Sequence, residues 1–365
     1  MTGRLGWSGW LGLLVGWVVL VGGRAGAAPF ELGQIFIAYN SNNIGVFADT
    51  ISTTGNLIGT INLQSLSPGS TFTTGATLTG GGEVALDEAG NLYVTVQNFE
   101  DTANRGLIKI DRNGNIVWKR GGGTTDYRGV AASATLNRVF VATAQGIDVY
   151  RADDGQPLAG ESFGGTLAFR DLVIDSQGNL YALRQAGGGQ LVIRRWESGN
   201  YTGSGSVVFV RGATTTDYRN SDLRALTMDE AGNLYITLNT PKVVLKVRPD
   251  PTGTTSEAAD LGSVDAFFSA PTTGTLIGLD YDPGTQRLFA SHTGTGIGQI
   301  LWIDRNASSG STMTAFGPTN LSGVRWLALY PTPEPSVALL VLAGGAALWW
   351  RRRQGGRESV HRKRE

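Results

Sequence analysis

The sequence lacks cysteine altogether and contains only two histidines. The absence of cysteine excludes disulfides, thiolate metal sites and cysteine nucleophiles. His361 falls in the C-terminal tail, which leaves His292 as the one histidine of the body. A single histidine excludes metal sites built from several imidazoles and disfavours a nucleophile–histidine–acid triad. We expect His292 to lie in a loop and to bond to backbone or solvent, and we predict no catalytic residue, no metal and no cofactor.

Charged residues are also scarce, at 16% of the chain, and the formal net charge of zero hides an asymmetry. The tail from Arg351 to Glu365 holds seven Lys or Arg and two Glu, which gives it a net charge of +5. Arg4 and Arg24 add two positive charges near the N-terminus, so the rest of the chain carries a net charge of about −7. A mildly acidic body binds polyanions poorly, so nucleic acid is not an expected partner.

Glycine is abundant instead, at 53 of 365 residues. This is about double the usual share of glycine in globular proteins. Together with Thr, Ser and Asn, glycine separates short apolar runs along the chain. Such a pattern indicates many short strands joined by turns.

A strand–turn–strand unit recurs along the body. It reads VALDEAGNLYVT at 84–95, LVIDSQGNLYAL at 172–183 and LTMDEAGNLYIT at 226–237, with longer variants at 130–142 and 279–291. The aromatic residue of the second strand recurs every 41 to 54 residues, at Tyr93, Phe140, Tyr181, Tyr235 and Phe289. A third and a fourth strand follow each marker. Four short strands at this period match the blade of a β-propeller.

A sixth unit is divided between the two ends of the chain. Residues 33–40, 43–50 and 56–63 supply its second, third and fourth strands, and residues 324–331 supply its first. The sequence therefore predicts an all-β, six-bladed β-propeller closed by pairing of the N- and C-terminal strands. Seven blades are the alternative, if residues 195–222 or 248–275 contain a further sheet. Residues 30–331 resemble the NHL-like and lactonase-like six-bladed propellers, and this resemblance implies a fold without implying an activity.

The N-terminus has the pattern of an export signal. Arg4 precedes an apolar run from Leu11 to Val21, and Ala25 and Ala27 form an A-x-A arrangement of small residues. We predict a signal peptide over residues 1–27 that is cleaved after Ala27. The alternative is an N-terminal membrane anchor that is never cut.

The C-terminus has an apolar run from Val337 to Trp350 that stops at three arginines, Arg351, Arg352 and Arg353. A helix over these residues would span about 21 Å, somewhat less than the roughly 30 Å hydrocarbon core of a bilayer. We predict a single transmembrane helix over 337–350, with the arginines as a membrane stop and a basic cytoplasmic tail over 351–365.

The segment before this helix carries a specific resemblance. PEPS at 333–336, a short apolar helix and RRR, in that order at the C-terminus, resemble the PEP-CTERM sorting signal, although Thr332 stands where the family usually has Val. The resemblance implies export across the inner membrane of a Gram-negative-type bacterium and an exosortase as partner. It also implies Pro333, Glu334 and Pro335 as the recognition motif, and a final place at a cell surface rich in exopolysaccharide. Domains are thus expected at 1–27, 28–331, 332–336, 337–350 and 351–365.

Aspartates at equivalent turns resemble metal ligands at first sight. We interpret them instead as turn formers, because each belongs to its own hairpin; they are Asp87, Asp175, Asp229 and Asp282. The resemblance to lactonase-like propellers implies that a channel metal would use Glu83 and Asp171, which share one aligned position. A secreted hydrolase or lyase with such a metal is the alternative function.

Arginines occupy one aligned position in four of the six units, at Arg128, Arg170, Arg224 and Arg325. This position opens the innermost strand, where the preceding loops surround one mouth of a propeller. Guanidinium groups there can hold a carboxylate, a sulfated sugar or a uronic sugar, with Tyr127 and Tyr218 beside them. Alternatively, the arginines pair with acids of the neighbouring blades, at Asp126, Asp171, Asp217 and Asp222.

These features together favour a non-enzymatic surface or matrix protein. We expect it to be anchored transiently in the inner membrane, sorted by an exosortase, and able to bind an exopolysaccharide or another surface component. A purely structural propeller without a small ligand is a further alternative.

Overall fold

The structure is a computed structural model of the whole chain, and part of that chain is described here. The described residues are 30–39, 43–48, 56–62, 83–96, 105–121, 126–214, 218–270, 274–294, 297–317, 321, 324 and 326–330. The expectations for residues 1–27 and 331–365 fall outside them. Among the described residues, no helix is long and apolar enough to cross a bilayer.

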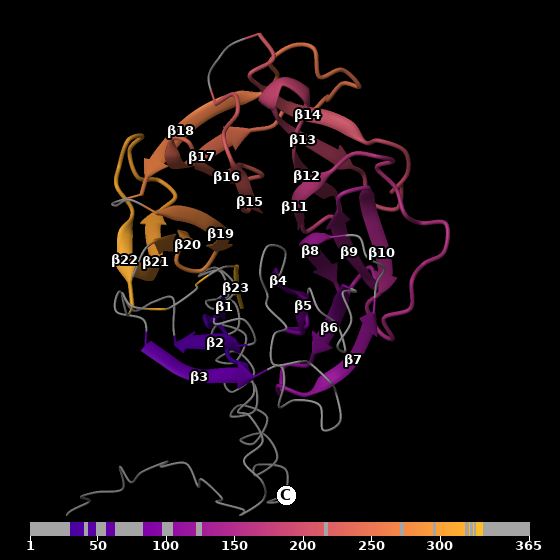
Figure 1. The fold of residues 1–365 in the computed structure, drawn as a ribbon, viewed down its shortest axis with the longest axis vertical. Helices are drawn as coiled ribbons and strands as arrows, with labels where there is room; N and C mark the ends of the chain where they lie inside the picture. The colour runs from indigo at the N-terminus through magenta and orange to yellow at the C-terminus, as the bar shows by residue number, and fades with distance from the viewer. Residues whose placement is uncertain are drawn as a thin grey trace, which may run out of the picture.

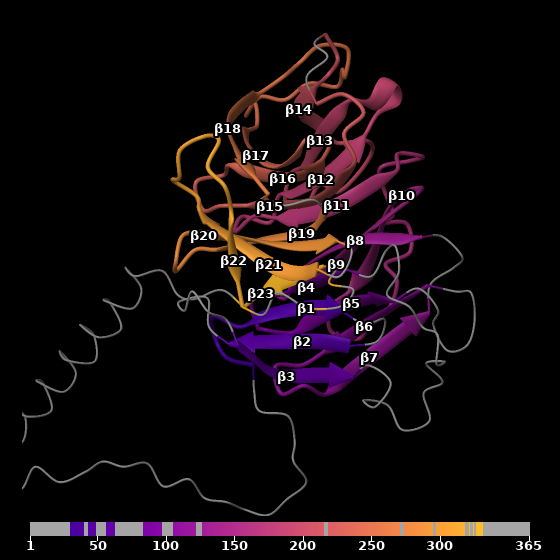
Figure 2. The same ribbon diagram turned by 60° about the vertical axis from the view of Figure 1, so that its left-hand side comes forward.

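Six antiparallel sheets surround a common axis, and this confirms the predicted six-bladed propeller (Figures 1 and 2). The first blade along the chain contains Val84–Leu86 (β4), Leu92–Val96 (β5), Gly106–Ile110 (β6) and Ile116–Gly121 (β7). The second contains Tyr127–Ser133 (β8), Arg138–Thr143 (β9) and Gly146–Arg151 (β10). The third contains Phe169–Ile174 (β11), Leu180–Gln185 (β12), Leu191–Trp196 (β13) and Ser206–Arg211 (β14).

The next two blades complete the uninterrupted part of the ring. The fourth contains Leu223–Met228 (β15), Leu234–Asn239 (β16), Lys242–Arg248 (β17) and Ser263–Ser269 (β18). The fifth contains Thr275–Asp282 (β19), Arg287–Gly294 (β20), Ile297–Asp304 (β21) and Thr314–Phe316 (β22). The stretches 195–222 and 248–275 hold the fourth strands β14 and β18, so neither contains the extra sheet that a seventh blade would need.

The sixth blade joins the two ends of the chain. It contains Leu327–Leu329 (β23), Ile35–Tyr39 (β1), Asn43–Ala48 (β2) and Asn56–Asn62 (β3). β23 pairs with β1 in antiparallel register, with Phe36 opposite Ala328. The predicted closure is therefore confirmed, and it ties both ends of the ring into one sheet.

The recurring hairpin forms because its aspartate organises the turn. Asp87 Oδ1 accepts the amides of Ala89 and Asn91 at 3.0 and 2.9 Å, and Asp87 Oδ2 accepts the Tyr93 hydroxyl at 2.9 Å. The marker aromatics of the second strands are buried between sheets. The same turn bonds occur at Asp175, Asp229 and, in a shorter form, Asp282. The interpretation of these aspartates as turn formers is confirmed.

Candidate functional site

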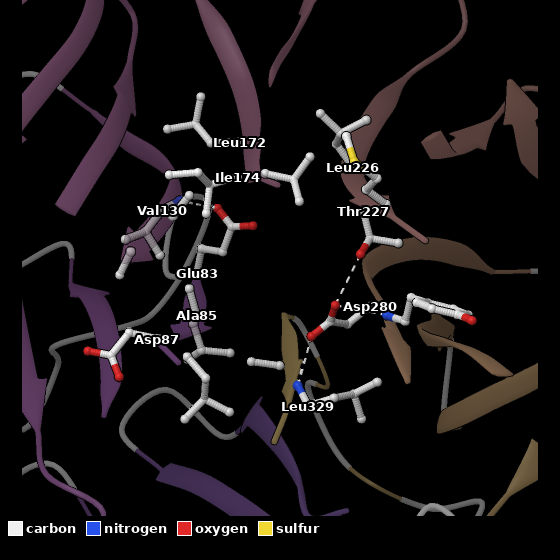
Figure 3. Close-up of a pocket in the computed structure, with 18 of the residues that line it drawn as sticks. Glu83, Ala85, Asp87, Val130, Leu172, Ile174, Leu226, Thr227, Asp280 and Leu329 are labelled. Carbon is white, nitrogen blue, oxygen red and sulfur yellow. Dashed lines mark hydrogen bonds between the residues drawn. The ribbon is translucent and has the colours of Figure 1, made fainter. Parts of the chain in front are cut away.

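The innermost strands of all six blades enclose a central cavity of about 310 Å³ (Figure 3). Its wall consists of short runs on β4, β8, β11, β15, β19 and β23, and most of these residues are apolar. Glu83 and Asp280 lie on opposite walls. The central cavity thus has a mostly apolar lining, into which a few carboxyl groups are set.

Three carboxyl groups near this axis each accept an amide from the innermost strand of the next blade. Glu83 Oε2 accepts the Val130 amide at 2.7 Å, Asp171 Oδ2 accepts the Leu226 amide at 2.6 Å, and Asp280 Oδ2 accepts the Leu329 amide at 2.8 Å. Glu83 and Asp171 are buried, and Asp280 is half-buried. Each carboxyl group therefore ties one innermost strand to its neighbour.

Two further contacts connect these ties with one another. The carboxyl groups of Glu83 and Asp171 hydrogen-bond to each other, and the Thr227 hydroxyl donates to Asp280 Oδ1 at 3.1 Å. The links thus join β8 to β4, β4 to β11, β11 to β15, β15 to β19 and β19 to β23. We call Glu83, Asp171 and Asp280 the carboxyl belt, because these three side chains, together with the Thr227 hydroxyl, link all six innermost strands.

Burial determines the protonation of the belt. Burial raises the pKa of Glu83 well above the usual range, and the nearby Asp171 carboxylate raises it further. Burial also raises the pKa of Asp171 and that of Asp280 to about 6, against the lowering effect of the hydrogen bonds they accept. Two adjacent buried carboxylates repel each other, so burial and the neighbouring Asp171 both favour the neutral form of Glu83.

Within the described residues, no three His, Cys, Asp or Glu side chains are arranged to hold a metal ion. Oxygens of Glu83 and Asp171, the pair that a lactonase-like metal site would use, accept the backbone amides of Val130, Leu172 and Leu226. A divalent cation needs several oxygens converging on one point. This arrangement gives the alternative of a metal-dependent hydrolase no support.

The arginines predicted at one mouth are the residues at which the innermost strands bulge. The pairing of the first and second strands shifts register between Tyr127 and Val130, between Phe169 and Asp171, and between Leu223 and Leu226. Arg128, Arg170 and Arg224 fall in these three intervals. A bulge redirects a side chain out of the regular pleat. We call these three residues the arginine mouth; Arg325 lies outside the described residues.

Two residues of the arginine mouth, Arg128 and Arg170, line a hollow of about 340 Å³. Its other lining residues are small or carry amides: Ala168, Gln185, Ala186, Gly189 and Asn220. Partial burial lowers the pKa of Arg170, and the positive charges of Arg128 and Arg224 lower it further. The guanidinium groups are therefore close enough to repel one another.

Pairing of these arginines with acids of the neighbouring blades, the alternative that the sequence left open, is not seen in the described part of the chain; Arg224 pairs instead with an acid two residues before it. Arg224 forms an ion pair with Asp222 at 2.7 Å. In the described part of the chain, neither Arg128 nor Arg170 has an ion pair or a hydrogen bond through its side chain. Asp126 pairs with Arg105 at 2.6 Å, Asp171 belongs to the carboxyl belt, and Asp217 falls outside the described residues.

The two tyrosines predicted beside the arginines do not line the hollow. Tyr127 is 2% exposed, and its hydroxyl bonds to that of Tyr150, so its ring cannot stack on a ligand. Tyr218 is half-buried and packs against the apolar core between the third and fourth blades. Tyr127 therefore belongs to the apolar core between the first and second blades.

His292 also differs from its expected place. It lies inside β20, fully buried, and Nδ1 contacts Gln299 Nε2 at 3.4 Å. Burial lowers its pKa, with a smaller contribution from Lys242. The strand extends two residues past His292, which is why the expectation of a solvent-bonded loop residue was wrong.

Sequence reasoning missed Asp280 and a set of hydroxyl groups. Asp280 stands two residues before the turn aspartate of its hairpin, Asp282. Glu83 and Asp171 each stand four residues before theirs. The alignment of the repeats on the turn therefore did not place the three acids at one position. The hydroxyls of Thr95, Thr237 and Ser291 accept the amides of Glu83, Ala225 and Gly278, which lie at or in the first strands of their blades, at 2.7 to 2.8 Å. The recurring aromatic-x-Thr or aromatic-x-Ser pattern was the signal that could have revealed them.

No protein-family model matches this sequence, and no curated protein matches it. Solved structures resemble the fold at low identity. A chain of the nidogen–laminin complex aligns with a TM-score of 0.54 at 13% identity, over 82% of this chain and 99% of that chain. A gluconolactonase from Xanthomonas campestris aligns with a TM-score of 0.44 at 14% identity, over 81% of this chain and 88% of its own. At these identities the likeness establishes the propeller fold alone.

Proposed function

We propose that this protein is an exported, non-enzymatic binding propeller that holds an anionic saccharide at the arginine mouth. One observation carries the proposal: Arg128 and Arg170 line a shared hollow, and neither forms an ion pair in the described part of the chain. Like charges held together cost free energy unless an anion joins them. A bound carboxylate would supply that anion through bidentate hydrogen bonds to a planar guanidinium group.

The surroundings of the two arginines support an external ligand. Asp126 and Asp222, each two residues from an arginine of the mouth, form ion pairs with Arg105 and Arg224, and Asp171 accepts backbone amides. Asp222 also attracts Arg170 through its charge, but neither Arg128 nor Arg170 forms an ion pair in the described part of the chain. A ligand carboxylate would therefore meet two guanidinium groups that hold no ion pair there.

The lining of the hollow supports a hydrophilic ligand. Gln185 and Asn220 contribute amides that can hydrogen-bond hydroxyl groups, and Ala168 and Gly189 leave space. No aromatic ring is among the described lining residues, so binding would depend on charge and hydrogen bonds. A sugar that bears a carboxylate matches this chemistry.

Binding is tested with a chain spanning residues 28–331, which retains every described strand of the closed ring. Polygalacturonate and a neutral polysaccharide serve as ligands, and Arg128→Gln/Arg170→Gln is the variant. We expect the variant to lose about tenfold or more of its affinity for the acidic polymer. Arg248→Gln is the matched control, because Arg248 is exposed on an outer strand. Equal binding by wild type and the double variant would eliminate the arginine mouth as the binding site.

We further propose that the protein reaches the cell surface through an exosortase. The order PEPS, apolar run, RRR at the C-terminus supports this, together with the export signal at the N-terminus. The full chain is expressed with and without a cognate exosortase, and its mass and location are followed. We expect loss of the segment after Pro333–Pro335 and release from the inner membrane. An uncut chain that stays in the membrane beside an active exosortase contradicts the sorting proposal.

A further inference from the structure

One wall of the hollow at the arginine mouth comes from the crossover between two blades. Asn220 lies between β14 of the third blade and β15 of the fourth, and it lines the hollow together with Arg128 and Arg170. The residue is exposed, and its side chain forms no hydrogen bond in the described part of the chain. A primary amide can donate and accept hydrogen bonds at the same time. Its polar atoms are therefore available to a ligand that enters the hollow.

The backbone of this crossover has a conformation that few residues adopt. Asn220 has a φ of 61°, and Tyr218, two residues before it, has a φ of 59°. This left-handed region costs free energy for every residue except glycine, although asparagine enters it more readily than most. Glycine would therefore suit position 220 better than asparagine, unless the amide of Asn220 has a use of its own.

A second left-handed asparagine shows what a structural use looks like. Asn137 has a φ of 52° in the turn between β8 and β9, at the end of β8 opposite to Arg128. Its Oδ1 accepts the Asp153 amide at 2.9 Å, so the side chain holds two turns of one blade together. Asn220 has no such bond among the described residues. The contrast favours a role for the Asn220 amide toward a ligand.

Hydrogen bonds to two blades hold Asn220 in place. Its backbone amide donates to Gly189 O at 2.8 Å, and a Cβ atom on Gly189 would collide with Asn220 Oδ1. The next residue, Ser221, donates through its hydroxyl to Thr240 O at 2.6 Å, and it accepts Gln185 Nε2 at 3.2 Å. The crossover is thus fastened to the third and the fourth blade. An amide fixed in this way loses little conformational entropy when a ligand binds.

We propose that Asn220 is the specificity-determining residue of the arginine mouth, and that it selects carboxylates with neighbouring hydroxyl groups, such as uronic sugars, over bare carboxylates. This inference rests on the proposed function, because it assigns the amide to the ligand that Arg128 and Arg170 hold. A guanidinium group binds any carboxylate, so the arginines alone do not distinguish a sugar acid from another acid. A neutral amide beside them forms hydrogen bonds only with a ligand that carries hydroxyl groups.

The test compares two ligands with a six-membered ring and one carboxylate. Methyl galacturonoside carries hydroxyl groups, whereas cyclohexanecarboxylate carries none. Each is titrated directly against the full chain by ligand-observed NMR. We expect the wild type to bind the sugar acid about tenfold more tightly. Asn220→Gly should lower this affinity about fivefold or more and leave the affinity for cyclohexanecarboxylate unchanged. Its melting temperature should not fall, because glycine adopts a positive φ without strain.

Asn137→Gly is the matched control, since it makes the same substitution at the other left-handed asparagine. It should leave both affinities unchanged. If Asn220→Gly changes the two affinities equally or changes neither, selection by the amide is wrong while the proposed function stands. If the wild type binds neither ligand, the proposed function fails and the selection fails with it. Binding of methyl galacturonoside by the wild type therefore tells the two failures apart.

A measurement without ligand tests the placement of the amide. Asn220→Asp brings a carboxylate to the hollow, and we expect the melting temperature to rise by about 2 °C at low salt. The rise should vanish at high salt and in the Arg128→Gln/Arg170→Gln background. The same variant should lose about tenfold or more of its affinity for methyl galacturonoside, because the chain then supplies its own anion. No rise, or a rise that persists without the two arginines, overturns the inference.

Discussion

At the scale of single residues, the buried carboxylates of this propeller accept hydrogen bonds from nearby amides and hydroxyls. An unpaired buried carboxylate costs several kcal/mol, so a buried acid persists only where hydrogen bonds surround it. Asp87 is 4% exposed and accepts two amides, the Asn91 side chain and the Tyr93 hydroxyl. Asp111 accepts the same two turn amides near the surface. The same Asp turn should therefore contribute more to stability where it is buried, at Asp87, than where it is exposed, at Asp111.

We expect Asp87→Ala to lower the free energy of unfolding by about 2 to 4 kcal/mol, because it leaves buried donors unpaired. Asp111→Ala is the control, and its loss should be about 1 kcal/mol, since water replaces the missing carboxylate. Urea unfolding followed by tryptophan fluorescence measures both. Equal losses in the two variants would show that depth does not matter at this turn.

The residue type alone did not reveal which arginines of the mouth form an ion pair in the described part of the chain. The repeat placed Arg128, Arg170 and Arg224 at one position, and all three indeed lie at strand bulges. Arg224 is neutralised by Asp222 two residues away, whereas the acids near Arg128 and Arg170 turn to other partners. Which acid a side chain reaches depends on distances across blades that a local pattern does not contain.

At the scale of elements, the bulges in β8, β11 and β15 place an arginine of each of these innermost strands at the arginine mouth. Each bulge frees an amide that no longer has a ladder partner and redirects the side chain before it. The freed amides are taken by carboxyl groups of neighbouring blades or by hydroxyls of the second strand. Close packing at the bulge then requires a residue without a side chain, as at Gly129.

We expect Gly129→Ala to lower the free energy of unfolding by about 1 to 3 kcal/mol, because the added methyl group meets backbone atoms that cannot move freely. It should also weaken binding at the arginine mouth. Gly187→Ala is the control, since a Cβ there meets no atom within 4 Å. Thermal unfolding and saccharide binding test the pair of variants. If Gly129→Ala left the free energy of unfolding unchanged, the close contact between the second and third blades would not contribute to stability.

At the scale of the whole molecule, stability and acidity are linked through the belt. Burial raises the pKa of Asp280 to about 6, above its value in an unfolded chain. A carboxyl group with a raised pKa stabilises the fold fully below its unfolded pKa, and this contribution is lost as the pH rises through about 6. Asp280 bonds to β15 and β23, so the effect reaches three blades.

We therefore expect the free energy of unfolding to fall between about pH 5 and about pH 7, by on the order of 2 kcal/mol for each carboxyl group of this kind. Asp280→Asn should flatten part of the slope while lowering the stability overall, because the amide nitrogen cannot accept a hydrogen bond. Thermal unfolding across this range provides the measurement. A melting temperature that rises with pH in the wild type would refute the linkage.

The sequence by itself determined the hairpins, their repeat and the closure of the ring. A turn such as that at Asp87 depends on residues at most six positions apart, so its pattern is visible locally. Only the tertiary structure decided the belt, whose bonds join residues 47, 55 and 49 positions apart. Those carboxyl groups meet because the closed ring brings six innermost strands to one axis.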